Sequence, residues 1–177
     1  LLRCDECRKE MIKASSIPLV FVSSTPYVFM CRDEAVTTLA DMKNKKVRAN
    51  GPWALILKDM GMVTVNVSAT ETYEAMQRGQ VDCTSGPVAW LKSYTLWDVA
   101  KVVTDFPIGT YHGNLLLGVS VEAWNSLTPN ARSVIRKNLA VLAADGAFRY
   151  EEEGEEAREA ARANKGVRFV QPGPDLK

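Results

Sequence analysis

The sequence predicts an α/β fold built on a largely parallel sheet. Between residues 27 and 106, short apolar runs typical of strands alternate several times with helical segments. Such alternation implies parallel strands with helices on both faces of the sheet. The composition, 46% hydrophobic and 24% charged, is that of an ordinary globular protein, and 177 residues suffice to bury a sizeable core.

Strands are expected where β-branched and apolar residues run between break signals. One break is Thr25-Pro26, which separates the first two runs. The expected strands are 17–24, 27–32, 47–50, 62–67, 81–85, 100–106, 114–120 and 167–170.

Helices are expected between these strands. Gly51-Pro52 opens a helix over about 53–60, because Pro is favoured at the first helical position, and Gly61 closes it. Thr70 has the character of an N-cap for the next helix, which Gly79 ends. The other expected helices are the end of one over 1–13, a short turn over 37–46, one over 87–97 and a long one over about 128–164 that begins at Thr128-Pro129.

Charge and composition exclude several functions. The formal net charge of +1 argues against a nucleic-acid surface, which needs a strong basic patch. No apolar run approaches the ~20 residues that a membrane span requires, so no membrane-spanning segment is expected. A single His in the chain argues against most metal sites and against His-based catalysis. We therefore expect no catalytic residues, no metal and no cofactor.

Arg48 is the leading candidate for ligand binding. It ends a strand and precedes a loop that leads into a helix N-terminus. Ligands of open α/β sheets bind at the carboxyl ends of strands, and a helix N-terminus favours anions there. A guanidinium in this place can hold a carboxylate through two parallel hydrogen bonds. The alternative is an ordinary surface arginine.

A second strand–turn–helix segment repeats this pattern at Thr84, Ser85 and Gly86. Their hydroxyl and N–H groups could hydrogen-bond an anion, although plain turn chemistry explains the same residues. Trp90, Tyr94 and Trp53 are candidate pocket walls, with core packing as the alternative. The pattern favours core packing for Trp97, because an aromatic stripe at helical spacing is usually buried.

The four cysteines divide into two pairs. Cys4 and Cys7 form a C-x-x-C pair, for which a structural disulfide, two quiet thiols or a redox motif are the alternatives. Cys31 and Cys83 each lie at the end of an expected strand, and a disulfide is feasible if those strands are neighbours.

Several separated segments resemble one family in order and spacing. They are "TTLADMKNKKVRANG", "LKDMGMVTVNVSATETYEAMQRGQVDCTSGP", "YTLWDVAKVVT" and "VSVEAWNSLTPNAR". These segments are similar to the DctP group of substrate-binding proteins of tripartite ATP-independent periplasmic (TRAP) transporters. The resemblance spans about residues 23–164.

The resemblance implies a type II-like, periplasmic-binding-protein-like bilobal fold with mixed, mostly parallel sheets and a long bracing helix. It assigns 1–25 to lobe I, 26–113 to lobe II, and 114–177, with the long helix, to a return into lobe I. It also implies that N-terminal and C-terminal parts of the full protein are missing from this chain.

The resemblance further implies a function. It predicts a periplasmic, non-enzymatic protein that binds a small organic acid in an interlobe cleft and delivers it to the permease subunits of a membrane transporter. The family's carboxylate-binding arginine falls on Arg48. A ligand-contacting Asn of many members is Gly86 here, so that side-chain contact is lost. Arg32 fits the spacing of a second cationic contact poorly.

Two other functions remain as alternatives. One is a redox or thiol protein that uses Cys4 and Cys7, although no general acid or base accompanies the pair. The other is the effector domain of a transcriptional regulator, which can share a bilobal fold but needs a DNA-binding helix-turn-helix.

Overall fold

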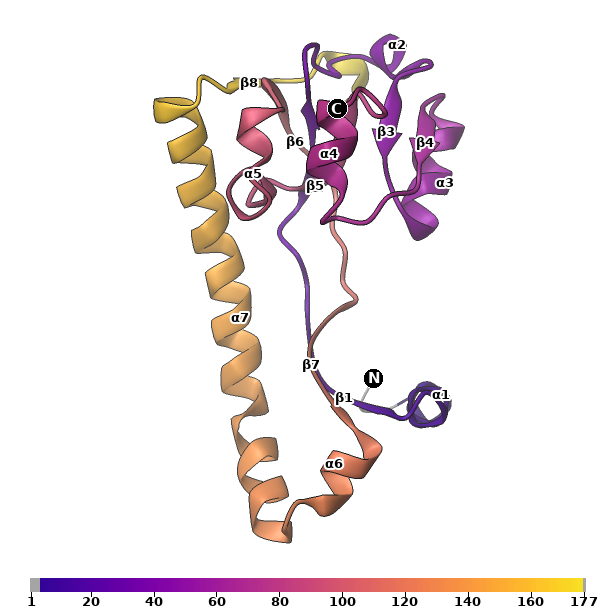
Figure 1. The fold of residues 1–177 in the computed structure, drawn as a ribbon, viewed down its shortest axis with the longest axis vertical. Helices are drawn as coiled ribbons and strands as arrows, with labels where there is room; N and C mark the ends of the chain where they lie inside the picture. The colour runs from indigo at the N-terminus through magenta and orange to yellow at the C-terminus, as the bar shows by residue number, and fades with distance from the viewer. Residues whose placement is uncertain (1–3, 177) are drawn as a thin grey trace. The chain divides into compact units, whose positions relative to one another are not determined.

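The computed structural model describes residues 4–176, which divide into two units (Figure 1). Among these residues, the first unit comprises 4–24 and 111–151, and the second comprises 25–110 and 152–176. The chain therefore passes from the first unit to the second and back, and it enters the second again within its longest helix.

The second unit is built on a six-stranded sheet with the order β4-β3-β5-β2-β6-β8. Only β2 runs antiparallel to its neighbours, β5 and β6, while the other paired strands are parallel. The expected mixed, mostly parallel sheet is confirmed. Its strands are β2 (Tyr27–Cys31), β3 (Lys46–Arg48), β4 (Val63–Val65), β5 (Cys83–Pro87), β6 (Val102–Gly109) and β8 (Arg168–Val170).

Each face of this sheet buries its own hydrophobic core, because successive side chains of a strand point to opposite faces. Along β2, Val28 and Met30 belong to one core, while Phe29 and Cys31 belong to the other. Helices α4 (Thr72–Gln77), α5 (Trp90–Ser93) and the end of α7 (Pro129–Asn164) contribute to the first core. Helices α2 (Leu39–Met42) and α3 (Gly51–Asp59) contribute to the second.

Residues 152–176 belong to the second unit, whereas the sequence analysis assigned all of 114–177 to lobe I. Strand β8 pairs in parallel with β6 of the second unit, from Val102↔Arg168 to Thr104↔Val170. Arg158 and Arg162 of α7 also form ion pairs with Asp105 of β6. These contacts join sequence-distant segments, so local pattern could not reveal them.

Two helix predictions are also corrected. The expected helix 87–97 is broken into α5 and a 3₁₀ turn (Leu96–Asp98), because Thr95 adopts a left-handed conformation with φ 56°. Thr70 is not an N-cap. The N-cap of α4 is Glu71, where no side chain caps the helix. Ser68 holds the turn before it: its hydroxyl accepts from the Glu71 N–H at 3.3 Å, and the Glu71 carboxylate accepts from the Ser68 N–H at 3.1 Å.

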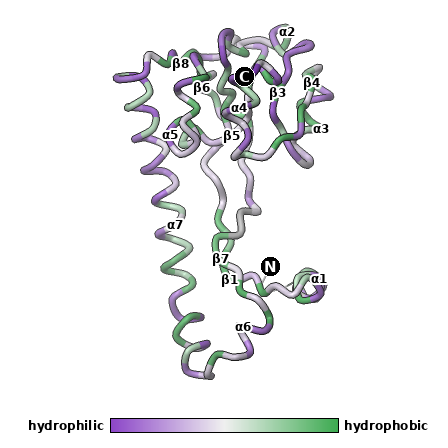
Figure 2. The backbone as a smooth tube through the Cα atoms, viewed as in Figure 1, coloured by the Kyte–Doolittle hydropathy of each residue, from purple (hydrophilic) through white to green (hydrophobic). Residues whose placement is uncertain are grey.

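The first unit contains an antiparallel pair of strands, β1 (Ser16–Val22) and β7 (Asn114–Ser120), whose hydrophobic residues are green in Figure 2. Helix α1 (Asp5–Lys13) precedes β1, and α6 (Val121–Ser126) follows β7. The expected cap of the long helix is confirmed, since the Thr128 hydroxyl accepts from the Ala131 N–H at 3.2 Å.

Both cysteine pairs form disulfides. Cys4–Cys7 lies at the start of α1, where the Cys4 sulfur also accepts from the Cys7 N–H. Cys31–Cys83 joins the neighbouring strands β2 and β5 at a register position where the two residues face each other, and both are buried. The structure therefore has no free cysteine among the described residues.

Removing the buried disulfide is expected to destabilise the protein more than removing the terminal one. Cys31 and Cys83 are 52 residues apart, whereas Cys4 and Cys7 are 3 apart, and a longer closed loop restricts the unfolded chain more. In denaturant unfolding of the intact protein, the Cys31→Ala/Cys83→Ala variant should lose roughly 2–4 kcal/mol. The Cys4→Ala/Cys7→Ala variant should lose less.

A thiol titration of unfolded, unreduced protein provides the control for this prediction. No cysteine among these four should react until a reductant is added. Two reactive thiols assigned to Cys31 and Cys83 would contradict the structure.

Candidate functional site

Arg48 ends β3 at the carboxyl edge of the sheet in the second unit. It lies between Val65 of β4 and Thr84 of β5 in the parallel register. Although it carries a charge, only 7% of its surface is exposed. The residue is therefore a buried cation and not an ordinary surface arginine.

The guanidinium of Arg48 has few partners. Its Nε–H donates to the carbonyl oxygen of Val67 at 3.0 Å, and its carbon lies 5.1 Å from the ring centroid of Trp90. Within residues 4–176, no carboxylate forms an ion pair with Arg48, and its two Nη groups make no hydrogen bond. Four N–H donors thus remain for another molecule.

The surroundings of Arg48 disfavour its charge. Burial lowers the pKa of Arg48 from its ordinary value, and Tyr27 and Tyr94 nearby raise it in part. Arginine still keeps its proton at neutral pH, because its ordinary pKa lies far above neutrality. A buried charge without a partner destabilises a protein, so an anion bound here would restore much of the lost solvation.

Four aromatic residues that contact one another in series, here called the aromatic cluster, reach Arg48 through Trp90: Tyr27, Trp53, Trp90 and Tyr94. Tyr27 contacts Trp53 edge-on, with centroids 6.1 Å apart, and lies 6.3 Å from Trp90. Trp90 and Tyr94 meet edge-on at 5.4 Å. The cluster and the guanidinium together combine one cation with large apolar surfaces.

Gly86 makes room for Trp90. A Cβ at position 86 would lie 2.4 Å from Cε3 of the Trp90 indole, far inside contact distance. The ring that contacts Arg48 therefore occupies the space that a side chain at position 86 would need. Only glycine at 86 is compatible with Trp90 in this position.

The two hydroxyls next to Gly86 differ in their partners. The Ser85 hydroxyl donates to the backbone carbonyl of Arg48 at 3.3 Å, so it supports the arginine from β5. The Thr84 hydroxyl is buried and has no partner among the described residues. Trp53 is half-buried, and its indole N–H likewise has no partner there.

The loop after Arg48 leads into α3 as expected. Asn50 precedes the helix, and its side-chain amide donates to the Val67 carbonyl oxygen at 3.1 Å, beside the bond from Arg48. Gly51 adopts φ 58°, a left-handed conformation that favours glycine. Arg48 and Asn50 thus both donate to the Val67 carbonyl oxygen, which fixes the loop that follows β4.

Sequence reasoning missed Tyr27 and placed Trp97 correctly. Tyr27 joins the cluster because β2 runs antiparallel, which brings its first residue to the carboxyl ends of β5 and β6. Trp97 packs against the core and under Lys165. Arg32 lies elsewhere, against Gly79, so it does not provide a second cation beside Arg48.

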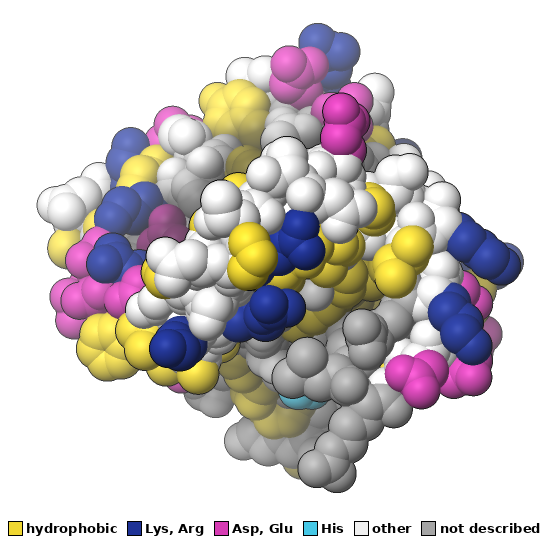
Figure 3. Space-filling model, turned by 90° about the horizontal axis from the view of Figure 1, so that it is seen from below, with side chains coloured by type: hydrophobic (Ala, Val, Ile, Leu, Met, Phe, Trp, Pro, Cys, Tyr) yellow, Lys and Arg dark blue, Asp and Glu magenta, His cyan; other side chains and the backbone are white. Residues whose placement is uncertain are grey.

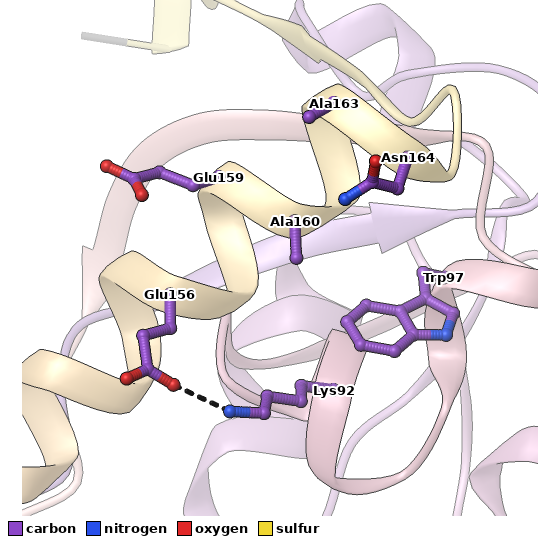
Figure 4. A pocket seen from close by; sticks show the side chains of 7 residues that line it. All are labelled: Lys92, Trp97, Glu156, Glu159, Ala160, Ala163 and Asn164. Carbon is purple, nitrogen blue, oxygen red and sulfur yellow. Dashed lines mark hydrogen bonds and ion pairs between the residues drawn. The ribbon is translucent and has the colours of Figure 1, made fainter.

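An open depression of ≈ 430 Å³ lies away from the aromatic cluster, between α5 and the end of α7 (Figure 4). Glu156 and Lys92 form an ion pair of 2.6 Å across it. The one basic side chain that lines the depression is thus already paired. The lining residues are Lys92, Trp97, Glu156, Glu159, Ala160, Ala163 and Asn164.

Neither metal binding nor a charged binding surface stands out. Among the described residues, no cluster of His, Cys, Asp or Glu has the makings of a metal site. On the face drawn in Figure 3, basic, acidic and hydrophobic side chains are mixed, and neither sign of charge covers the part that is described. No helix in residues 4–176 combines the length and apolar character needed to cross a bilayer.

Comparison with protein families gives a match over residues 5–177 to DctP, described as bacterial extracellular solute-binding protein, family 7. The chain belongs to this family. A search of curated proteins found no match. The DctP family consists of transport proteins that bind solutes, in agreement with the resemblance seen in the sequence.

Solved structures of TRAP periplasmic solute-binding proteins share the fold. One from Bradyrhizobium sp. in complex with galacturonate is 21% identical, with a TM-score of 0.81 over 97% of this chain and 57% of its own. One from Citrobacter koseri with bound D-glucuronate is 22% identical, with a TM-score of 0.81 and the same coverage. One from Rhodoferax ferrireducens with bound malonate is 19% identical, with a TM-score of 0.79 over 97% of this chain and 54% of its own.

The DctP-family chain therefore spans somewhat more than half the length of these solved proteins. The likeness confirms a periplasmic-binding-protein-like α/β fold.

Substituting Gly86 should disturb the site. In Gly86→Ala, the added methyl group collides with Trp90, so the free energy of unfolding should fall by about 1–3 kcal/mol and tryptophan fluorescence should change.

Gly154→Ala is the matched control. Its Cβ would lie 3.5 Å from Val88, an ordinary contact, and alanine favours the helix, so stability should rise by about 0.5–1 kcal/mol. Equal effects of the two substitutions in denaturant unfolding would contradict the role given to Gly86.

Proposed function

We propose that this chain is part of an extracytoplasmic solute-binding protein that captures a carboxylate-containing small molecule through Arg48. The intact protein delivers that molecule to the membrane permease subunits of a TRAP-type transporter. It acts in the periplasm and catalyses no reaction. Membership of the solute-binding family supports the transport role.

The observation that carries this proposal is the unpaired charge of Arg48. A guanidinium with 7% exposure and two uncommitted Nη groups matches a carboxylate, whose two oxygens accept two parallel hydrogen bonds. The molecules named with the similar solved proteins (galacturonate, glucuronate and malonate) all contain a carboxylate. Their shared group is the one that Arg48 is suited to bind.

The remaining candidate residues take supporting roles in this proposal. Trp90 and Trp53 form apolar walls beside the carboxylate. Ser85 positions Arg48 through its hydrogen bond to the Arg48 carbonyl, while Gly86 admits Trp90. Thr84 places one uncommitted hydroxyl beside Arg48 in the strand register.

The two disulfides support the periplasmic location, because disulfides persist in oxidising compartments such as the bacterial periplasm. A redox function for Cys4 and Cys7 has less support. The pair already forms a disulfide at the start of α1, and no general acid or base among the described residues hydrogen-bonds to it. A regulator effector domain has no supporting observation in this chain.

Removing the cation should weaken binding strongly. In the intact protein, Arg48→Ala should weaken carboxylate binding by about 2–5 kcal/mol, which corresponds to roughly 30-fold to several thousandfold in Kd. Isothermal titration calorimetry against a panel of carboxylates that includes galacturonate, malonate and benzoate measures the loss.

Arg32→Ala is the matched control, since it removes an arginine that faces Gly79 and not the aromatic cluster. Its affinities should equal those of the wild type. Unchanged affinity of the Arg48→Ala variant for a carboxylate that the wild type binds would overturn the assignment of Arg48.

A further inference from the structure

We propose that the ligand is an aromatic monocarboxylate, and that Trp90, admitted by Gly86, selects its planar ring. This inference rests on the proposed function, because it takes the carboxylate on Arg48 as given. It adds the nature of the rest of the molecule. Three features of the second unit carry it.

The first feature is the single cation. Arg48 lies over the Trp90 ring of the aromatic cluster, whereas the other cation–π pairs of the described residues in this unit involve Phe169 and Trp97, outside the cluster. Arg32 faces Gly79, and Lys92 is paired with Glu156. One guanidinium satisfies one carboxylate, and a second carboxylate placed among the aromatic rings would lose its hydration without a partner. The arrangement thus favours a monocarboxylate over a dicarboxylate.

The second feature is the shortage of polar groups. The Ser85 hydroxyl and the Asn50 amide N–H are already committed to backbone carbonyls of Arg48 and Val67. The Thr84 hydroxyl and the Trp53 indole N–H have no partner, but both atoms are buried. A sugar acid has several hydroxyls, and each needs a hydrogen-bond partner when it leaves water. This unit therefore offers a hydroxylated body little compensation.

The third feature is the position of the Trp90 ring. The indole fills the space above Gly86 and lies against the guanidinium, 5.1 Å from its carbon. A carboxylate on the Nη groups of Arg48 would place the body of its molecule next to this ring and to its neighbours Tyr27 and Tyr94. Aromatic rings pair favourably with one another beyond the area that they bury. A planar ring attached to the carboxylate can therefore pack against Trp90 over a larger area than a non-planar group can.

Calorimetry of the intact protein against four acids tests this inference: benzoate, cyclohexanecarboxylate, malonate and galacturonate. Benzoate should bind most tightly, by about two- to tenfold over each of the others, because one aromatic pair contributes about 0.5–1.5 kcal/mol. Tighter or equal binding of malonate or galacturonate would overturn the inference while leaving the proposed function intact. Equal binding of cyclohexanecarboxylate would overturn the requirement for a planar ring. Binding of none of the four would contradict the inference and the proposed function together.

Variants at Trp90 test the role given to this ring. Trp90→Ala should weaken benzoate binding by about tenfold and bring it near cyclohexanecarboxylate, whereas Trp90→Phe keeps a ring and should stay close to the wild type. Trp97→Ala is the matched control, because Trp97 packs away from Arg48, under Lys165. The melting temperature of each variant without ligand shows whether it folds. Unchanged benzoate affinity in Trp90→Ala would overturn the selection by Trp90.

Discussion

The contact between the buried guanidinium of Arg48 and the ring of Trp90 is the interaction on which the candidate site depends. It exists because Gly86 leaves open the space that the indole fills, and because the Val67 carbonyl holds the guanidinium at Nε. Ser85 adds a hydrogen bond to the Arg48 backbone. None of these partners is anionic, so the charge of Arg48 stays uncompensated within the described part of the chain.

Strand β5 links this site to the stability of the second unit. It lies between β3 and β2, and its side chains alternate between the two faces of the sheet. Cys83 joins the core on one face and forms the disulfide to Cys31, while Gly86 lies under Trp90 and its neighbours in the core on the other face. The strand that carries the site is thus fixed covalently to its neighbour, which suits a binding surface that must keep its geometry.

Sequence pattern predicted most elements, because these depend on local signals. Alternating apolar runs identified the strands, and the strand–loop–helix context made Arg48 the candidate for ligand binding. The break at Thr95 was missed because a left-handed threonine has no sequence signature, and the pairing of β8 with β6 was missed because it joins distant segments. Tyr27 entered the site through an antiparallel register, and the lack of an ion pair at Arg48 is visible only in three dimensions.

Binding of an anion by Arg48 can be observed at the guanidinium itself. NMR spectroscopy of the intact protein with ¹⁵N-labelled arginine provides this test, with the Arg48 guanidinium signals assigned by their absence in Arg48→Lys. When benzoate, malonate or galacturonate is added to saturation, the Arg48 signals should shift and exchange more slowly with water, while those of Arg32 stay unchanged. Binding of any of these acids that shifts other residues but leaves the Arg48 guanidinium unaffected would contradict the account.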